Sequence, residues 1–323
     1  MKTIPRIRFA HLPTPIEPLP RLSAELGGPK LLVKRDDLTG PAFGGNKIRK
    51  LEFLLAEAQS HGAKTVITAG AVQSNHSRQT AAVCARLGFN CMLVLSGEKP
   101  PRASGNLLLD QLFNAQVVWT SLDEREQMLQ QTFQKAWDAG KRPYLIPYGG
   151  SNPTGATGFV FAMKEMLDQN YQPDWIVFAS SSSGTQAGLI TGARLFGFKG
   201  KVLGISVDEP EANLKANVAN LANATADTLG ERINFLPEEV LVCADYLGGG
   251  YGVMGTQEIE AIRLFGRLEG LLLDPVYTGR AAAGLIDLIK KGFFTPDETV
   301  LFWHTGGGPA LFSEKYANLA NPI

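Results

Sequence analysis

The sequence predicts an α/β protein of two domains, with twisted, mainly parallel sheets flanked by helices. Short segments rich in β-branched and aromatic residues alternate with longer segments of helical periodicity, as βαβ units require. The 323 residues suggest two domains, because one domain usually takes roughly 100–200 residues. Hydrophobic residues make up 44% of the chain and charged residues 19%, which suffices for packed cores.

The expected elements alternate along most of the chain. A strand at residues 64–68 (KTVIT) precedes a helix over 74–87, which Gly88 ends. A strand at 91–95 (CMLVL) leads into a helix around 106–113. A strand at 174–179 (DWIVFA), a Ser/Gly turn and a helix over 185–195 follow, and the Ala- and Asn-rich run 212–228 is expected to be an ordinary helix. Further strands are expected at 116–119, 143–146, 202–207 and 300–304.

The composition gives no indication of a nucleic-acid-binding, membrane-bound, disulfide-linked or metal-binding protein. Lysine plus arginine equals aspartate plus glutamate, 31 each, so nothing favours nucleic acid or a membrane surface as partner. Cys84, Cys91 and Cys243 form no CxxC pair, which is typical of a reducing compartment. The four histidines lack metal-ligand spacing, so no metal is expected. No apolar run approaches the ~20 residues that span a bilayer, and we expect a cytoplasmic protein.

Three small, polar segments follow expected strands. They are residues 69–76, 180–184 and 305–309, all rich in glycine, serine or other small residues. Parallel sheets bind ligands at the carboxyl ends of their strands. The sequence therefore predicts that these segments form a binding site.

Lys47 lies in a basic, glycine-rich segment, residues 43–50 (FGGNKIRK), after the charged run 34–37 (KRDD). A lysine on such a turn at a helix start can be desolvated, which lowers its pKa and makes the amine a nucleophile toward a carbonyl group. Taken alone, the segment is more often a helix start with solvated charges. The role of Lys47 therefore depends on what else the chain supplies.

The serine-rich segment 180–185 (SSSSGT) lies between a strand and a helix, as a phosphate-binding loop does. It lacks the lysine of a Walker A loop and is not a GxGxxG motif, so neither a nucleoside triphosphate nor a dinucleotide is indicated. The other interpretation is a polar, flexible loop. We interpret it as a phosphate site.

The segment 69–76 (AGAVQSNH) also precedes a helix. Its Ser74 and Asn75 either bind an anion such as a substrate carboxylate or cap the helix, and both interpretations can hold together. His76 could be a base or a ligand, although a lone histidine is more often structural.

Two tyrosines and a threonine stand in turns that could reach the same site. Tyr277 could move a proton, Thr278 could hydrogen-bond a heterocyclic nitrogen, and Tyr251 lies in a glycine-rich loop that could close over a ligand. Each turn alone is more often an ordinary turn. An imine-forming lysine together with a phosphate cradle suggests pyridoxal phosphate, and the residues by themselves support a phosphate-bearing cofactor in an α/β enzyme.

The sequence resembles the D-cysteine desulfhydrase / 1-aminocyclopropane-1-carboxylate deaminase family, within the tryptophan synthase β-like (fold type II) pyridoxal-phosphate enzymes. The resemblance covers nearly the full length. It is carried, in the family's order, by the blocks KRDD, FGGNKIRKLEF, TAGAVQSNHSRQTAA, IPYGGSNPTGATGF, SSSSGTQAGL, LLLDPVYTGRAAAGL and HTGGGPALF. Several blocks in order are far more specific than any one of them.

The resemblance implies a role for each site residue. Lys47 looks like the lysine that holds the cofactor as a Schiff base, and Lys50 looks like a phosphate contact. Asn75 looks like the partner of the cofactor's 3′-oxygen and, with Gln73 and Ser74, part of the substrate-carboxylate site. Tyr251 and Tyr277 look like the tyrosines that flank the substrate. The phosphate-binding loop comprises Ser181, Ser182, Ser183, Gly184 and Thr185.

Two threonines are similar to the desulfhydrase branch. Thr278 stands where the deaminases carry a glutamate that faces the pyridine nitrogen, and Thr305 stands where they carry a leucine. A carboxylate keeps the ring nitrogen protonated and the ring a strong electron sink. A hydroxyl supports a weaker sink, which suffices when a good leaving group such as thiolate departs.

The resemblance implies a large cofactor-binding domain of residues 1–50 and 155–323 and a small α/β domain of residues 51–154. We expect a homodimer that acts on a small amino acid and converts D-cysteine to pyruvate, ammonia and hydrogen sulfide by α,β-elimination. Elimination of sulfite from L-cysteate and deamination of 1-aminocyclopropane-1-carboxylate are the alternatives of similar chemistry. A non-catalytic protein that binds pyridoxal phosphate or another phosphometabolite is the alternative of another class.

Overall fold

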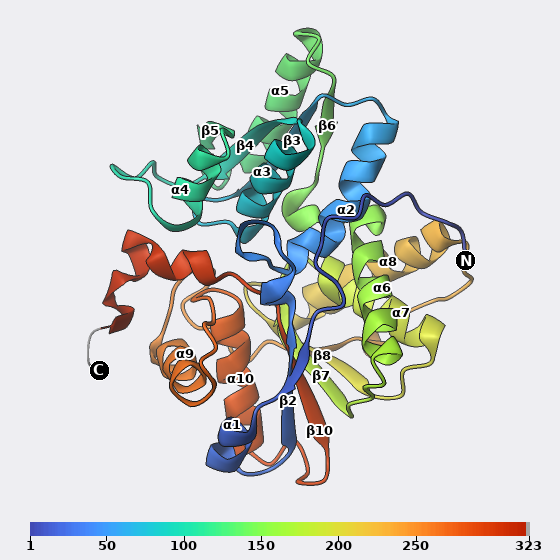
Figure 1. The fold of residues 1–323 in the computed structure, drawn as a ribbon, viewed down its shortest axis with the longest axis vertical. Coiled ribbons are helices and arrows are strands. Elements are labelled where there is room, and N and C mark those ends of the chain that lie inside the picture. The colour runs from blue at the N-terminus through green and yellow to red at the C-terminus, as the bar shows by residue number, and fades with distance from the viewer. Residues whose placement is uncertain (321–323) are drawn as a thin grey trace.

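The computed structural model describes residues 1–320 and contains two β-sheets flanked by helices (Figure 1). The larger sheet has the strand order β1-β2-β10-β7-β8-β9, and only β1 is antiparallel to its neighbour. The smaller sheet has the order β5-β4-β3-β6 and is parallel throughout. The expected α/β architecture is confirmed. The larger sheet comprises β1 (Ile16–Pro18), β2 (Lys30–Arg35), β7 (Trp175–Ser180), β8 (Lys201–Ser206), β9 (Leu241–Cys243) and β10 (Thr299–His304), and the smaller β3 (Thr65–Ala71), β4 (Asn90–Ser96), β5 (Gln116–Thr120) and β6 (Pro143–Leu145).

Helices cover both faces of the larger sheet because its central strands are apolar on both faces. On β7, Ile176 and Phe178 pack in a core with α6 and α7, whereas Val177 packs in the opposite core with α1, α9 and α10. These helices are α1 (Pro20–Leu26), α6 (Pro153–Asp168), α7 (Gly184–Phe196), α9 (Thr256–Glu269) and α10 (Thr278–Lys290), and α8 (Glu211–Leu229) packs on the outside of α7.

The smaller sheet is built in the same way. Val66 on β3 packs in a core with α2 (Asn46–Ser60) and α3 (Asn75–Leu87), and Ile67 faces α5 (Arg125–Asp138). A fourth helix, α4 (Gly105–Leu112), packs beside α3. Helix α2 lies between the two sheets (Figure 1) and packs against α6 as well as α3.

The strands and helices expected from the sequence lie within a few residues of their observed positions. The largest difference is at β3, which continues through Gly70 and Ala71, both of which pair with β4. The smaller sheet is formed only by strands from residues 51–154. The division into two domains stays a prediction. None of the helices within residues 1–320 is long and apolar enough to cross a membrane.

Candidate active site

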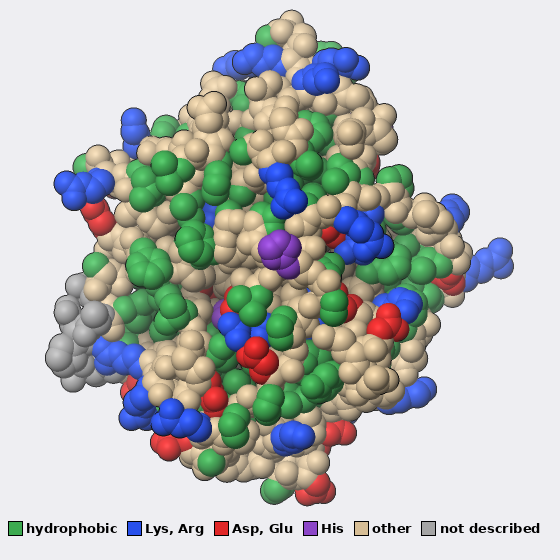
Figure 2. All heavy atoms as spheres, in the orientation of Figure 1, with side chains coloured by type: hydrophobic (Ala, Val, Ile, Leu, Met, Phe, Trp, Pro, Cys, Tyr) green, Lys and Arg blue, Asp and Glu red, His purple; other side chains and the backbone are tan. Residues whose placement is uncertain are grey.

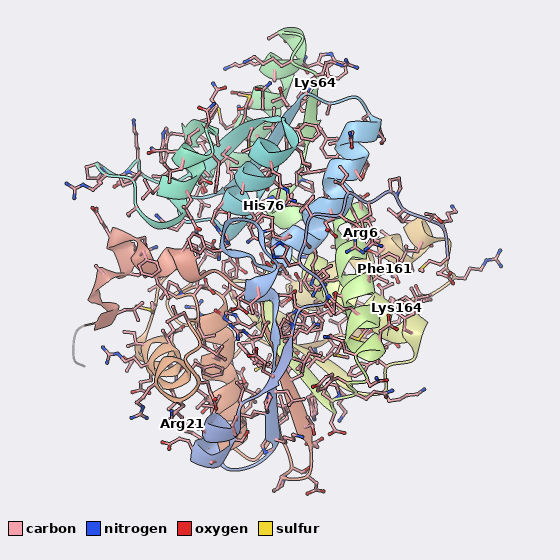
Figure 3. All side chains as sticks on the ribbon, viewed as in Figure 1. Arg6, Arg21, Lys64, His76, Phe161 and Lys164 are labelled. Carbon is pink, nitrogen blue, oxygen red and sulfur yellow. The ribbon has the colours of Figure 1, made fainter. Side chains whose placement is uncertain are left out.

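The three small, polar segments that follow strands meet at one cavity between the two sheets. One side comes from the start of α3, and the other comes from the turns after β7 and β10. Figure 3 shows His76 at the end of α3 that faces the larger sheet. The side chains or backbone that line the cavity belong to Asn46, Lys47, Ser74, Asn75, His76, Tyr148, Gly149, Ala179, Ser180, Ser181, Ser182, Ser183, Thr185, Tyr277, Thr305 and Gly306.

Lys47 lies in this cavity, in the first turn of α2, with no carboxylate partner among the described residues. Burial lowers the pKa of Lys47 from 10.5 to about 8, because an ammonium group is poorly solvated there. Lys50 is one turn further along, and burial together with the charge of Lys47 holds its pKa well below its usual value. Its ammonium group donates to the Gly149 carbonyl and to the Ser151 hydroxyl, each at 3.2 Å. Two neighbouring amines that form no ion pair among the described residues make this end of the cavity suited to an anion.

The loop after β7 forms a cradle opposite Lys50. No side chain caps the first turn of α7. The Gly184 amide donates to the Ser182 carbonyl, and the next amides, of Thr185 and Gln186, are left for an anion. A Cβ atom on Gly184 would lie 2.8 Å from the Lys50 Nζ and 2.7 Å from the Ser151 Oγ, so only glycine leaves the cradle open. Ser183 has a φ of 66°, a strained conformation of the kind that is often found at ligand sites. The Ser182 hydroxyl lies 2.9 Å from the Ser151 hydroxyl.

Ser74 caps α3, as expected, by accepting a hydrogen bond of 3.1 Å from the Ser77 amide. It also lines the cavity, together with Asn75. Gln73 is placed differently: its side chain donates to the Ser104 carbonyl and accepts from the Asn106 amide. Its side-chain amide is therefore occupied by the start of α4, and its contact with a substrate carboxylate stays a prediction.

Tyr251 and Tyr277 are brought together, with 2.7 Å between their hydroxyl oxygens. Only Tyr277 lines the inner cavity, whereas Tyr251 lines an outer one. Burial raises the pKa of both phenols well above 10, so both are protonated at neutral pH. The pair can therefore donate a proton into the cavity. A third phenol, that of Tyr148, lines both cavities, and burial raises its pKa too.

Thr278 is fully buried at the start of α10 and does not line the cavity. Its hydroxyl donates to an Asp274 carboxylate oxygen at 2.8 Å and accepts from the Asp274 amide at 2.6 Å. Asp274 also accepts from the backbone amides of Tyr277 and Thr278, so it holds the turn that presents Tyr277. The expected role of Thr278 toward a ring nitrogen stays a prediction.

His76 is neutral in this site. Burial and the charges of Lys47 and Lys50 lower its pKa well below 6.5. The Thr68 hydroxyl donates to the Ile146 carbonyl and therefore accepts from the Nε2 of His76, at 2.9 Å. The proton is thus on Nε2, and Nδ1 is a bare acceptor without a partner in residues 1–320.

An outer cavity of about 690 Å³ leads to the inner one, and the two share Tyr148, Ser181 and Ser182. This volume is ample for a small amino acid. Asp208 lines it, accepts from the Ser181 hydroxyl at 3.1 Å and leaves its Oδ1 without a partner in the described part of the chain. Burial raises the pKa of Asp208.

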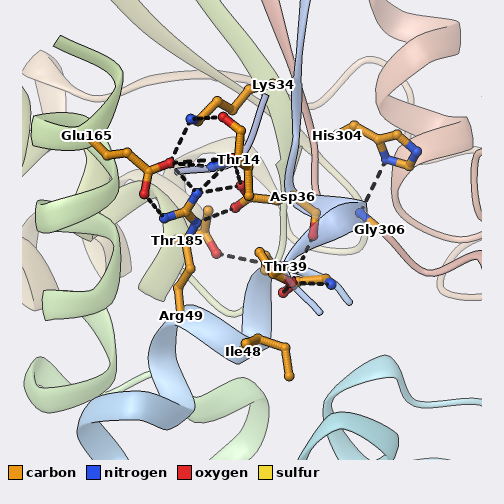
Figure 4. A network of polar contacts seen from close by, with 12 residues as sticks. Thr14, Lys34, Asp36, Thr39, Ile48, Arg49, Glu165, Thr185, His304 and Gly306 are labelled. Carbon is orange, nitrogen blue, oxygen red and sulfur yellow. Dashed lines mark hydrogen bonds and ion pairs between the residues drawn. The ribbon is translucent and has the colours of Figure 1, made fainter. Parts of the chain in front are cut away.

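A buried network of charges fixes the start of α2 (Figure 4). Arg49 binds Asp36 through two hydrogen bonds of 2.7 Å and binds Glu165 through two of 2.9 Å. Lys34 donates to Glu165 at 2.7 Å. Burial opposes ionisation of Glu165, but the hydrogen bonds from Arg49 outweigh it and lower its pKa to about 2. Because Arg49 lies between Lys47 and Lys50 in sequence, this network anchors the helical turn that carries both lysines.

The structure thus brings together Lys47, Ser74, Asn75, Tyr277, Thr305 and the loop Ser181–Thr185, with Lys50 and Tyr251 adjoining. The arrangement holds an anion at one end, a basic amine in the middle and a protonated phenol opposite. Sequence reasoning missed Tyr148, Asp208, Asp274 and Asn106. Of these, only Asp274 had a local signal, an Asp-Pro turn.

Comparison with known proteins identifies one family and several similar structures. Residues 7–306 match the family described as pyridoxal-phosphate dependent enzyme. A solved structure of an ACC deaminase homologue has 38% sequence identity and a TM-score of 0.89, over 98% of this chain and 96% of that chain. A threonine deaminase from T.th. (22% identity, TM-score 0.67, 93% of each chain) shares the fold. So does a hydrogen sulfide-producing enzyme from Fusobacterium nucleatum (16% identity, TM-score 0.63, 94% of this chain and 96% of that chain).

Proposed function

Because the chain belongs to the family of pyridoxal-phosphate-dependent enzymes, we propose that it is a carbon–sulfur lyase that converts D-cysteine to pyruvate, ammonia and hydrogen sulfide. The observation that carries the proposal is the pairing of a base and an acid in one cavity. Lys47 has a lowered pKa and Tyr277 a raised one, as removal of the Cα proton and protonation of a departing group require. Thr278 stands where the resembling deaminases carry a carboxylate, and its hydroxyl is bound to Asp274, so this position supplies no carboxylate to a ring nitrogen; that favours substrates with a good leaving group.

The described residues fit the family's cofactor. The cradle of Ser181–Thr185 and the Lys50 ammonium suit its phosphate, and Gly184 keeps that cradle open. Thr305 and Gly306 line the cavity beside Asn75, where the ring would lie. Lys47 is the amine placed to hold the cofactor covalently. When bound, pyridoxal phosphate supplies a conjugated ring that takes up the electron pair released from Cα.

Different residues of this chain then bind the substrate, remove the Cα proton and donate a proton to the leaving group. Ser74 and the backbone at the start of α3 bind the substrate carboxylate. The neutral amine of Lys47 removes the proton from Cα, and the Cβ–S bond breaks as the electron pair moves toward sulfur. Tyr277, kept protonated and backed by Tyr251, donates to the departing hydrosulfide. The unsaturated amine that leaves the site takes up water and gives pyruvate and ammonia.

Release of a 2-oxo acid from a panel of amino acids tests this function. The panel comprises D-cysteine, L-cysteine, L-cysteate, D-serine, β-chloro-D-alanine and 1-aminocyclopropane-1-carboxylate. We expect the highest kcat/KM for D-cysteine, with one sulfide for each pyruvate. A preference for the cyclopropane substrate, which the 38%-identical ACC deaminase homologue makes the second candidate, would contradict the proposal. A yellow protein that released no 2-oxo acid would favour a non-catalytic binder.

The reactivity of Lys47 is expected to follow its pKa. Only the neutral amine attacks a carbonyl group, so the amine is blocked by a proton below a pH of about 8 and is free above it. In cofactor-free protein, the rate at which added pyridoxal phosphate develops its bound visible absorbance should rise with pH and level off above about 8. A rate that kept rising toward pH 10.5 would show that Lys47 is solvated like an ordinary lysine.

We also propose that the chain acts as a homodimer in the cytoplasm. Large apolar side chains are exposed around a groove between α4 and η5 (Gly308–Phe312), among them Phe43 (69% exposed) and Phe312 (73%). Figure 2 shows hydrophobic side chains gathered over this region, and such a patch is typical of an interface. The three cysteines are unpaired, which suits a reducing compartment. Light scattering that returned the mass of a single chain would contradict the dimer.

A further inference from the structure

A buried asparagine on α4 contacts the cavity's lining residues without lining the cavity itself. Asn106 is fully buried in the first turn of α4. It lies 31 residues after Asn75 in the sequence. Its backbone amide donates to the Gln73 Oε1 at 2.8 Å. Its side-chain Nδ2 donates twice, to the Gln73 carbonyl at 2.8 Å and to the Asn75 Oδ1 at 2.9 Å. One side chain therefore holds both the loop before α3 and the amide of Asn75.

These contacts determine which way round the Asn75 amide lies. Its Oδ1 is occupied by a donor from Asn106, so its Nδ2 must point to the other side. Asn75 lines the cavity, and none of the described residues accepts a hydrogen bond from its Nδ2. The amide thus presents its N–H groups, and not its carbonyl oxygen, to the cavity. An acceptor bound there, above all an anionic oxygen, meets a donor that needs no reorientation.

The orientation of Asn106 is itself fixed by its partners. Its Nδ2 faces two acceptors, the Gln73 carbonyl and the Asn75 Oδ1, and a turned amide would place an oxygen against both. Its Oδ1 has no partner among the described residues. A buried acceptor left unpaired is costly, and it is tolerated here while both amide hydrogens are used.

We propose that Asn106 is a positioning residue that makes Asn75 a hydrogen-bond donor to the ring oxygen of bound pyridoxal phosphate. The inference rests on the proposed function only for the cofactor, not for the substrate. Asn106 acts through Asn75 on the cofactor and, separately, through Gln73 on the loop that binds the substrate carboxylate.

The first test uses protein with cofactor and without substrate. Asn106→Ala and Asn106→Asp should both shift the pH midpoint at which the visible absorbance of the bound cofactor titrates, in the direction that Asn75→Ala shifts it. They should also weaken cofactor binding in equilibrium dialysis by about tenfold, the effect of one lost hydrogen bond. Aspartate matches asparagine in shape but cannot make both donations. If Asn106 only filled space, Asn106→Asp would titrate and bind the cofactor like the wild type. That result would overturn the proposal.

The double variant Asn75→Ala/Asn106→Ala separates positioning from general damage. If Asn106 acts on the cofactor through Asn75, the double variant should titrate like Asn75→Ala alone. If the shift of the pH midpoint in the double variant equalled the sum of the shifts in the two single variants, the proposal would be overturned. Leu107→Ala is the matched control, because Leu107 is the next residue of α4, is buried in the core and donates nothing to the cavity. It should lower thermal stability while leaving the cofactor's titration unchanged.

The substrate panel distinguishes a failure of this inference from a failure of the proposed function. A protein that rejected D-cysteine but showed the shared shift of Asn75 and Asn106 variants would retain this inference and lose the proposed substrate. In the active enzyme, Asn106→Ala should also raise KM for the amino acid through Gln73, an effect that Asn75→Ala should not reproduce in full.

Discussion

Replacing Lys47 by alanine is expected to lower kcat by about 10²–10⁴-fold, the range for loss of a general base. Lys47 is the amine with a pKa lowered to about 8 that lines the cavity, so it both holds the cofactor and receives the Cα proton in the proposed reaction. The variant should bind pyridoxal phosphate through the cradle alone and lack the visible absorbance of the covalently held cofactor. Steady-state kinetics and an absorption spectrum check both results.

Lys47→Arg is the control for charge. It keeps a cation in the cavity, but a guanidinium group is neither deprotonated nor nucleophilic at neutral pH. It should therefore be as inactive as Lys47→Ala. Activity retained by either variant would mean that Lys50, or another amine, does the chemistry.

Replacing Arg49 by methionine is expected to lower the free energy of unfolding by about 3–5 kcal/mol, because Asp36 and Glu165 would remain buried without their cation. Arg49 is 2% exposed and Asp36 fully buried, so solvent cannot replace the lost bonds. Urea unfolding of the cofactor-free protein measures the loss. Because Arg49 anchors α2 between Lys47 and Lys50, the folded variant should also bind pyridoxal phosphate more weakly.

Lys164→Met on α6 is the matched control for Arg49→Met. Lys164 is beside Glu165 in sequence but forms an exposed ion pair with Asp168, and Figure 3 shows it on the outer side of α6. Exposed ion pairs four residues apart on a helix contribute little to stability, so the free energy of unfolding should fall by no more than about 0.5 kcal/mol. Equal losses for the two variants would show that the buried network does not stabilise the fold.

Short-range features of this site could be predicted from the sequence. Ser74 as a helix cap and the serine loop before α7 are visible because a cap or an anion site depends on residues a few positions apart. The strands were predictable for a similar reason, since buried parallel strands are short, apolar runs. The roles of Lys50 and Asn75 came from the family resemblance and not from spacing.

Features that depend on distant partners could not be predicted. The run around Arg49 is by pattern a solvated, charged helix start, yet Arg49 is buried because Glu165, 116 residues away, neutralises it. Asn106 gives no local signal, because its function depends on the packing of α4 against α3. Tyr148 reaches the cavity only because the turn after β6 lies beside the loop that contains Ser182.

The most direct test of the central claim is to find which amine holds the cofactor. Borohydride reduction of the yellow protein, followed by digestion and peptide mass spectrometry, fixes the cofactor to the residue that binds it. We predict a single modified residue, Lys47, because it lines the cavity while Lys50 is engaged by Gly149 and Ser151. Modification of Lys50, or of a surface lysine with Lys47 intact, would contradict the account.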